Sequence, residues 1–203
     1  MTKTILITGA SSGFGLMLAN KLHQQGFNVI GTSREPEKYA DKAPFKLLRL
    51  NIDDDKSIQS FIDELFRLTK RLDVLVNNAG YMVTGLAEET PLELGRQQFE
   101  TNFWGTVKVT NALLPHFRKQ KQGQIITVSS IVGLIGPPNL SYYTASKHAV
   151  CSRHHAVMAR RLRRRRFFIV LTCTANFPVR LVAHRCVKPR KSKVAVLVFA
   201  RFA

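Results

Sequence analysis

A glycine-rich segment near the amino terminus restricts the fold more than any other feature of this sequence. It reads Thr8-Gly9-Ala10-Ser11-Ser12-Gly13-Phe14-Gly15, after an apolar run at residues 3–8 and before a helical pattern at 13–25. Glycine permits positive φ and close approach to the backbone, so this turn can present N–H groups and a helix N-terminus to a pyrophosphate. Without its flanking strand and helix, the segment would fit a plain tight connection equally well.

The first 150 residues alternate short apolar runs with longer amphipathic segments. This alternation is typical of a parallel sheet covered by helices on both faces. We expect strands at 3–8, 27–32, 45–50, 72–76 and 124–129, and helices at 13–25, 55–69 and 91–119. The last helix is preceded by Thr90-Pro91-Leu92-Glu93, which combines a capping box with proline at the first helical position. The predicted class is α/β, a Rossmann-like doubly wound parallel sheet, with residues 1–150 as one domain.

Charge is distributed unevenly along the chain. Residues 1–150 hold 17 Lys and Arg against 13 Asp and Glu, whereas residues 151–203 hold 14 basic and no acidic residues, which gives most of the net charge of +18. Six arginines fall within positions 160–166, and such a cluster can neutralise phosphates. No aromatic stacking pattern or recognised module accompanies it, so we expect no specific nucleic-acid partner.

Several other classes of site are disfavoured. No apolar stretch reaches the roughly 18 to 20 residues that a membrane span needs, and the start of the chain lacks a secretory signal pattern, so we expect a cytoplasmic protein. His154 and His155 are adjacent rather than at ligand spacing, and the three cysteines lack CxxC spacing. Asp53-Asp54-Asp55 precedes a helix and is interpreted as its cap. We therefore expect no metal site.

Three further motifs follow the glycine turn in order. Asn77-Asn78-Ala79-Gly80 follows the fourth expected strand, Asn102 lies in the long helix, and Tyr143-Thr144-Ala145-Ser146-Lys147 begins 13 residues after Ser130. With the glycine turn, they resemble the TGxxxGxG, NNAG, helix-asparagine and YxxxK motifs of the short-chain dehydrogenase/reductase family. The resemblance covers about 150 residues. It implies a Rossmann-like core, a small-molecule alcohol or carbonyl substrate, and a homodimer or tetramer.

The resemblance also implies a catalytic tetrad. Reducing a carbonyl leaves negative charge on oxygen, which calls for a proton donor and a polarising donor. Tyr143 would be the general acid/base, Ser130 would orient the substrate oxygen, and Asn102 would support a water in a proton relay. A free phenol has a pKa of about 10, and a positive charge one helical turn away lowers it. Lys147 would supply that charge and also hold the nicotinamide ribose.

Two neighbours compete with these assignments. Ser129 is a plausible substitute for Ser130, and Tyr142 for Tyr143. The 13-residue and four-residue spacings of the family favour Ser130 and Tyr143.

The residues at the end of the second expected strand indicate whether NAD or NADP is the preferred cofactor. It ends in Thr32-Ser33-Arg34, without a carboxylate for a ribose 2′-hydroxyl. A guanidinium can pair bidentately with a 2′-phosphate, so NADP is favoured; the alternative is that Arg34 is a solvated loop cation. Asn51 stands where the family usually has an aspartate that contacts adenine, and an amide can still accept a hydrogen bond there. The residues expected to bind the cofactor are Thr8, Gly9, Ser11, Ser12, Gly13, Phe14, Gly15, Arg34, Asn51, Asn78, Ala79, Gly80, Tyr143 and Lys147.

The character of the sequence changes after residue 150. The Arg:Lys ratio moves from 6:11 to 11:3, and acidic residues vanish. This change favours the hypothesis that residues 151–203 are translated from a shifted reading frame and form a basic segment of doubtful fold, which leaves the C-terminal part incomplete or irregular. The alternative interpretation keeps residues 167–173 as a sixth strand and Phe177-Pro178-Val179-Arg180 as a remnant of the following turn.

Three functions are therefore compatible with the sequence. The first is an NADP-dependent oxidoreductase that interconverts an alcohol and a carbonyl. The second is a catalytically impaired nucleotide-binding remnant of such an enzyme, and the third is a basic protein that associates with nucleic acid.

Overall fold

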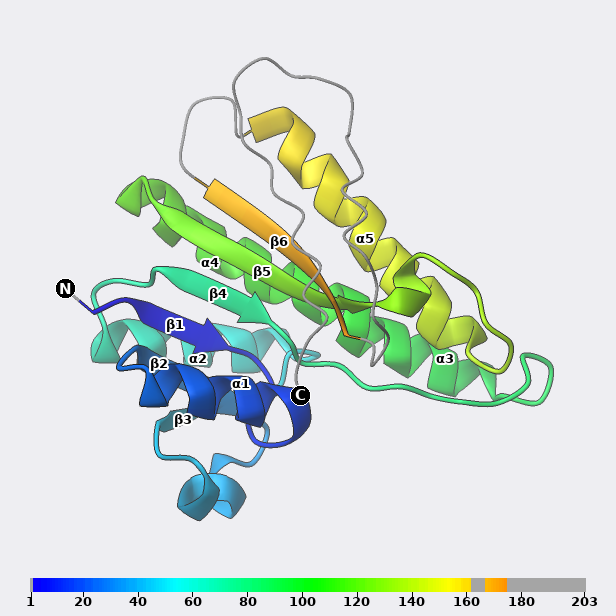
Figure 1. Ribbon diagram of the computed structural model, residues 1–203, viewed down its shortest axis with the longest axis horizontal. Helices are drawn as coiled ribbons and strands as arrows, with labels where there is room; N and C mark the ends of the chain where they lie inside the picture. The colour runs from blue at the N-terminus through cyan, green and yellow to red at the C-terminus, as the bar shows by residue number, and fades with distance from the viewer. Residues whose placement is uncertain (1, 162–166, 175–203) are drawn as a thin grey trace.

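Six parallel strands form the central sheet (Figure 1). The computed structural model describes residues 2–161 and 167–174, with side chains through residue 152. The strand order is β3-β2-β1-β4-β5-β6, with all neighbours parallel. The strands are β1 (Thr4–Ile7), β2 (Asn28–Ser33), β3 (Lys46–Arg49), β4 (Val74–Asn77), β5 (Gly123–Ser130) and β6 (Phe167–Thr174). The order reverses between β1 and β4, which is where doubly wound folds bind ligands, beyond the carboxyl ends of the strands.

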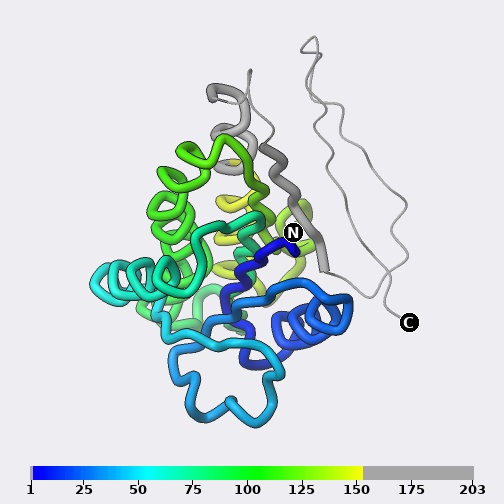
Figure 2. Tube along the Cα trace, turned by 90° about the vertical axis from the view of Figure 1, so that its left-hand side faces the viewer, coloured from blue at the N-terminus to red at the C-terminus, as the bar shows by residue number. Residues whose placement is uncertain are grey.

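Helices cover both faces of this sheet. Figure 2 shows α1 on one side and α2 and α4 on the other. Alternate strand residues point to opposite faces, so Ile5 and Ile7 pack toward α1 while Leu6 packs with Phe61 of α2 and Phe117 of α4. The α-helices are α1 (Gly13–Gln24), α2 (Asp55–Leu68), α3 (Leu92–Phe99), α4 (Thr106–Gln120) and α5 (Ser141–Arg161).

The predicted α/β class is confirmed, with every expected strand and helix present to within two residues. The expected helix at 91–119 contains an unforeseen interruption, because the π-helix η2 (Glu100–Gly105) separates α3 from α4. Short π segments often occur at functional sites, and this one carries Asn102. Two 3₁₀ helices, η1 (Pro36–Lys42) and η3 (Ile131–Gly133), were also not expected.

The predicted helix caps are partly confirmed. Asp54 caps α2, because its carboxylate accepts hydrogen bonds from the first backbone N–H groups of the helix at 3.1 Å. Asp53 instead accepts a hydrogen bond from the Thr101 hydroxyl at 2.8 Å. The predicted capping box before α3 is wrong: Thr90 donates its hydroxyl hydrogen to the Leu86 carbonyl oxygen at 2.7 Å, and α3 has no side-chain cap.

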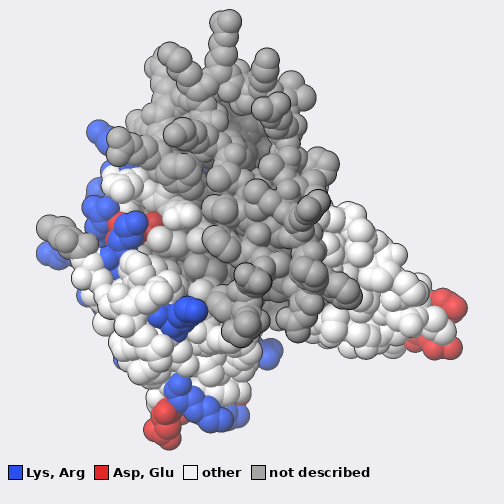
Figure 3. All heavy atoms as spheres, in the orientation of Figure 1, with Lys and Arg blue, Asp and Glu red and all other residues white. Residues whose placement is uncertain are grey.

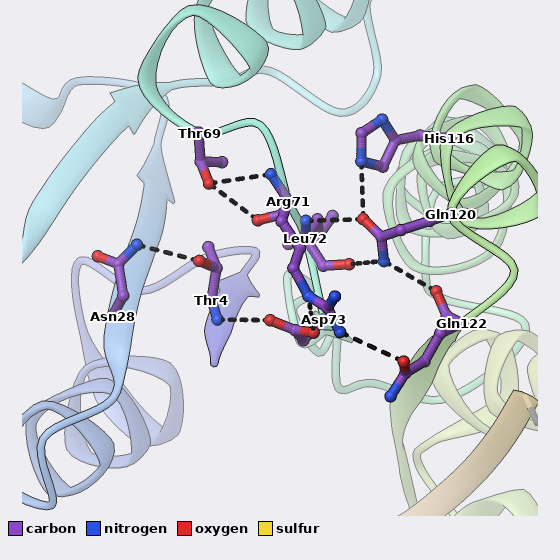
Figure 4. Close-up of polar contacts among 9 residues, drawn as sticks. All are labelled: Thr4, Asn28, Thr69, Arg71, Leu72, Asp73, His116, Gln120 and Gln122. Carbon is purple, nitrogen blue, oxygen red and sulfur yellow. Dashed lines mark hydrogen bonds and ion pairs between the residues drawn. The ribbon is translucent and has the colours of Figure 1, made fainter. Parts of the chain in front are cut away.

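A polar network fixes the amino ends of β1 and β4 to the end of α4 (Figure 4). The buried Asp73 carboxylate accepts hydrogen bonds from the Thr4 backbone N–H at 3.0 Å and from Arg71 Nε at 2.7 Å. The Gln120 side chain donates to the Leu72 carbonyl oxygen at 2.7 Å and accepts from the Leu72 N–H at 3.2 Å. This end of the sheet is therefore a rigid support for the opposite, carboxyl end.

The described chain continues in regular structure after residue 150. Helix α5 runs to Arg161, and β6 pairs with β5 along its whole length. The strand that the alternative interpretation expects at residues 167–173 is therefore present, as β6. The predicted turn remnant at residues 177–180 lies outside the described residues.

Candidate active site

Two glycines of the turn between β1 and α1 have a left-handed backbone. Gly9 has φ 65° and Gly13 has φ 54°. A Cβ atom at Gly9 would lie 2.9 Å from the Ala79 Cα atom, and one at Gly15 would overlap the Gly9 carbonyl oxygen. A Cβ atom at Gly13 would meet nothing within 4 Å. Packing thus requires glycine at positions 9 and 15, whereas Gly13 borders open space that a phosphate can approach.

Thr8 and Asn78 join this turn to the end of β4. The Thr8 hydroxyl accepts hydrogen bonds from the backbone N–H groups of Asn78 at 2.9 Å and Ala79 at 3.0 Å. The Asn78 amide donates to the carbonyl oxygens of Thr8 at 2.9 Å and Gly9 at 3.0 Å. These residues, expected to bind the cofactor, hold the glycine turn in shape at the point where the strand order reverses.

The amino end of α1 has no side-chain cap. Ser12 is the N-cap residue, and its hydroxyl makes no capping hydrogen bond. Ser12 and Gly13 are exposed, while Ser11 and Phe14 are half-buried. Uncapped N–H groups at a helix N-terminus bind anions well. The turn that was predicted to bind phosphate therefore presents N–H groups that no side chain caps.

Arg34 stands at the carboxyl end of β2 with its guanidinium exposed. Within the described residues this guanidinium makes no hydrogen bond or ion pair. Its acidic neighbours are already paired, because Glu35 contacts Lys38 Nζ at 2.6 Å and Glu37 contacts Arg49 at 2.8 Å. The residues around Arg34 therefore fit a 2′-phosphate.

Tyr81, which follows the end of β4, is a residue of this site that sequence reasoning missed. Burial raises the pKa of the Tyr81 hydroxyl above its ordinary value; the Asp53 carboxylate raises it further, and the Arg34 guanidinium lowers it. Tyr81 thus lies near both charges, and its place directly after the NNAG motif could have indicated this.

The Asn51 side-chain oxygen, expected to face adenine, accepts a hydrogen bond from the Asp53 backbone N–H at 3.3 Å.

Lys147 is buried beside Tyr143 on α5. Only 6% of Lys147 is exposed, and its Nζ atom lies 5.6 Å from the centroid of the Tyr143 ring. The ammonium donates a hydrogen bond to the Val128 carbonyl oxygen of β5 at 3.2 Å. A Cβ atom at Gly80 would lie 3.8 Å from Lys147 Nζ. The predicted lysine therefore lies between the ends of β4 and β5, next to the phenol ring.

Asn102 connects the π-helix to both sides of the site. Its side chain accepts a hydrogen bond from the Tyr81 N–H at 3.0 Å and donates to the Tyr81 carbonyl oxygen at 2.9 Å and to Ser146 Oγ at 3.2 Å. The Ser146 hydroxyl donates in turn to the Tyr143 carbonyl oxygen at 2.7 Å. Thr106 donates its hydroxyl hydrogen to the Asn102 carbonyl oxygen at 3.0 Å. Asn102 thus positions the start of α5 relative to the end of β4.

The two competing residues are engaged elsewhere. Ser129 Oγ lies 3.2 Å from the buried Cys151 Sγ of α5, whereas the Ser130 hydroxyl accepts a hydrogen bond from the Val132 N–H of η3 at 3.4 Å. The Tyr142 ring packs against α3, where a Cβ atom at Gly95 would lie 2.7 Å from it. Helix α5 contacts η3, which follows Ser130 directly.

Other kinds of site are not found in the part of the chain that the structure describes. No group of three His, Cys, Asp or Glu side chains there could hold a metal ion. None of the described helices has the length and apolar character of a membrane span. The side chains of the arginine cluster at 160–166 and of His154 and His155 lie outside the described residues.

Comparison with known proteins identifies relatives over most of the chain. It is 44% identical over 158 residues to the uncharacterized oxidoreductase YusZ of Bacillus subtilis, covering 73% of this chain and 56% of that protein. It is 42% identical over 146 residues to 3-ketodihydrosphingosine reductase of Bacteroides thetaiotaomicron, covering 72% and 54%. The chain thus spans little more than half the length of these curated relatives.

Solved structures show the same fold. The structure of ElxO with NADP bound aligns with a TM-score of 0.75 at 30% identity, covering 85% of this chain and 73% of that one. A short-chain dehydrogenase/reductase of Burkholderia phymatum in complex with NAD aligns with a TM-score of 0.79 at 25% identity, covering 85% and 65%. The sequence profile of the short chain dehydrogenase family matches residues 3–183. The chain therefore belongs to the short-chain dehydrogenase family.

Proposed function

We propose that the protein is an NADP-dependent oxidoreductase that interconverts a small-molecule alcohol and its carbonyl compound. The observation that carries this proposal is the buried Lys147 ammonium, which lies beside the Tyr143 ring and close to Gly80. A buried charge is costly unless it is paired or hydrogen-bonded, so its presence at the ligand-binding edge of the sheet favours a chemical role.

Arg34 supports NADP rather than NAD as the cofactor. When bound, the cofactor supplies or accepts the hydride. The uncapped start of α1 and the open space at Gly13 would hold the pyrophosphate, and the Arg34 guanidinium would pair with the 2′-phosphate. One similar structure contains NADP and another contains NAD, so the preference rests on Arg34 and not on the likeness.

Tyr143 would carry the proton of the reaction. In the reducing direction its hydroxyl donates a proton to the carbonyl oxygen as the carbonyl carbon receives the hydride, and in the oxidising direction the phenolate takes that proton back. The Ser130 hydroxyl would donate a hydrogen bond to the same oxygen and stabilise its developing charge. The Lys147 ammonium favours the phenolate by its positive charge. Asn102 would hold α5 in place through Ser146.

The loops around this edge support an uncharged, apolar substrate. Residues 79–87 after β4 and 131–146 after β5 contain no charged side chain. Their exposed apolar side chains are Tyr81, Met82, Leu86, Leu134 and Ile135. The two loops are joined where the Gly85 N–H donates to the Asn139 carbonyl oxygen at 3.0 Å. The name of the Bacteroides relative, 3-ketodihydrosphingosine reductase, supports a ketone as the reacting group.

The proposal is tested by titrating the protein with NADPH and following cofactor fluorescence, then adding a panel of uncharged aldehydes and ketones. We expect saturable binding and carbonyl-dependent NADPH oxidation. Binding without turnover of any carbonyl would instead identify the chain as a nucleotide-binding remnant, and absence of binding would overturn the proposal. Gel retardation at several salt concentrations tests the nucleic-acid alternative, because phosphate-driven binding weakens steeply with salt.

A further inference from the structure

At the start of the loop after β2, a cation that makes no ion pair within the described residues lies next to two carboxylates. Arg34 is followed by Glu35 and Glu37, either of which could attract its guanidinium or repel a phosphate. We propose that Arg49 is a positioning residue for NADP recognition, which keeps the Arg34 guanidinium available by pairing with Glu37 and by fixing the Arg34 backbone. This inference rests on the proposed function and concerns the same adenosine end of the site.

The guanidinium of Arg49 makes both contacts at once. Arg49 ends β3 and is in register with Ser33, the residue before Arg34, so its side chain reaches the loop from the adjacent strand. Its NH1 group donates to the Arg34 carbonyl oxygen at 2.7 Å, and its NH2 group donates to the Glu37 Oε2 atom at 2.8 Å. The planar guanidinium thereby fixes the separation between the Arg34 backbone and the Glu37 carboxylate.

Glu37 would otherwise compete with the phosphate. A backbone hydrogen bond lowers the pKa of Glu37 below its ordinary value; desolvation opposes this, and Arg49 and Lys38 lower the pKa further, so the carboxylate is charged at neutral pH. Glu35 has its own partner, because Lys38 lies 2.6 Å from it. Figure 3 shows acidic and basic side chains next to one another over η1, at the lower edge of the view. Of the two carboxylates next to Arg34, Glu37 is therefore the one that is paired with a cation from another strand.

Stability alone does not account for this pair. Arg49 and Glu37 have side chains that are 60% and 58% exposed, and exposed ion pairs stabilise a fold by about 1 kcal/mol or less. The Arg49→Ala protein should therefore fold normally. The variant should instead change cofactor affinity, because the charge around the adenosine ribose determines whether a 2′-hydroxyl or a 2′-phosphate binds better.

The experiment measures calorimetric binding of NADP⁺, NAD⁺ and 2′,5′-ADP to four proteins: wild type, Arg49→Ala, Glu37→Gln and the double variant. We expect Arg49→Ala to weaken NADP⁺ and 2′,5′-ADP binding about fivefold and to leave NAD⁺ unchanged. The double variant should regain wild-type affinity, because no carboxylate is left to compete with the phosphate. Arg96→Ala is the matched control, since it removes an arginine from an exposed ion pair with Glu93 on α3.

Each other outcome overturns the inference. If the double variant binds as weakly as Arg49→Ala, Arg49 contacts the phosphate itself. If Arg96→Ala weakens binding equally, only the overall charge matters, and an unchanged Arg49→Ala protein leaves no role for the residue. The wild-type protein tests the proposed function separately. If it binds neither NADP⁺ nor 2′,5′-ADP, the proposed function is wrong.

Discussion

Lys147 and Tyr143 are fixed relative to each other by the end of β5. The Lys147 ammonium lies 5.6 Å from the centroid of the Tyr143 ring while donating a hydrogen bond to the Val128 carbonyl oxygen at 3.2 Å. Residues four apart share one face of a helix, and the carbonyl of a neighbouring strand holds the longer side chain in place. The lysine is thus held at the crevice, where it can act on the phenol.

The glycine turn should tolerate a side chain at one position and not at another. Gly9→Ala should destabilise the protein by about 2 to 4 kcal/mol, because a positive φ and a contact of 2.9 Å with the Ala79 Cα atom add together. Gly13→Ala should cost only about 1 kcal/mol, from the backbone alone. Urea unfolding of both variants checks the difference, and equal losses would contradict the packing described for Gly9.

Arg34→Ala should change the preference between cofactors. We expect NADPH affinity to fall by about 10- to 100-fold, the effect of losing hydrogen bonds to a charged phosphate, while NADH affinity stays unchanged. Fluorescence titration with each cofactor measures both. A parallel loss for NADPH and NADH would show that Arg34 supports the loop and does not recognise the phosphate.

His116 should make the stability of the protein depend on pH. Burial lowers the pKa of His116 below its ordinary value of 6.5, partly offset by the hydrogen bond with Gln120, and Lys119 lowers it further. The unfolded chain therefore binds the proton more readily, so this contribution is complete above about pH 6.5 and is lost as the pH falls below it. His116→Phe keeps the stacking on Phe66 without a titrating group.

The comparison is made by urea unfolding at pH 7.5 and pH 5.5. The loss of stability on acidification should be smaller in His116→Phe than in the wild type. An identical loss in both proteins would exclude His116 as its source.

The reading-frame hypothesis for residues 151–203 stays a prediction. It expects the coding DNA in the neighbouring frame to continue α5 with acidic and small residues after codon 150. The family profile extends to residue 183 and β6 pairs with β5, which any account of this segment has to accommodate. If neither neighbouring frame encodes a family-like continuation, the hypothesis is wrong.

The sequence predicted the scaffold well because its signals are local. Alternating apolar residues and a glycine turn set the strands and helices, and fixed motif spacing indicated Tyr143 and Lys147. The π-helix at 100–105 escaped prediction, and its Asn102 bonds to Tyr81, 21 residues away in sequence. No local pattern distinguishes such a turn from the flanking helices.

Some side-chain roles could not be read from the sequence either. Thr8 and Asn78 match a cofactor-binding motif, yet their hydrogen bonds hold the two strand ends together. The pairing of Glu37 with Arg49 joins residues that lie on different elements, so it depends on the register of β2 and β3. Roles of this kind follow from the packing of the strands and not from the motif.

Turnover by Tyr143→Phe, compared with Tyr142→Phe, tests the central claim most directly. Both changes remove one hydroxyl, but only Tyr143 lies beside the Lys147 ammonium, whereas the Tyr142 ring packs on α3. With a carbonyl that the wild type reduces, Tyr143→Phe should lose about 10²- to 10⁴-fold in rate while binding NADPH normally, and Tyr142→Phe should keep most of its turnover. Retained reduction by Tyr143→Phe would contradict the account.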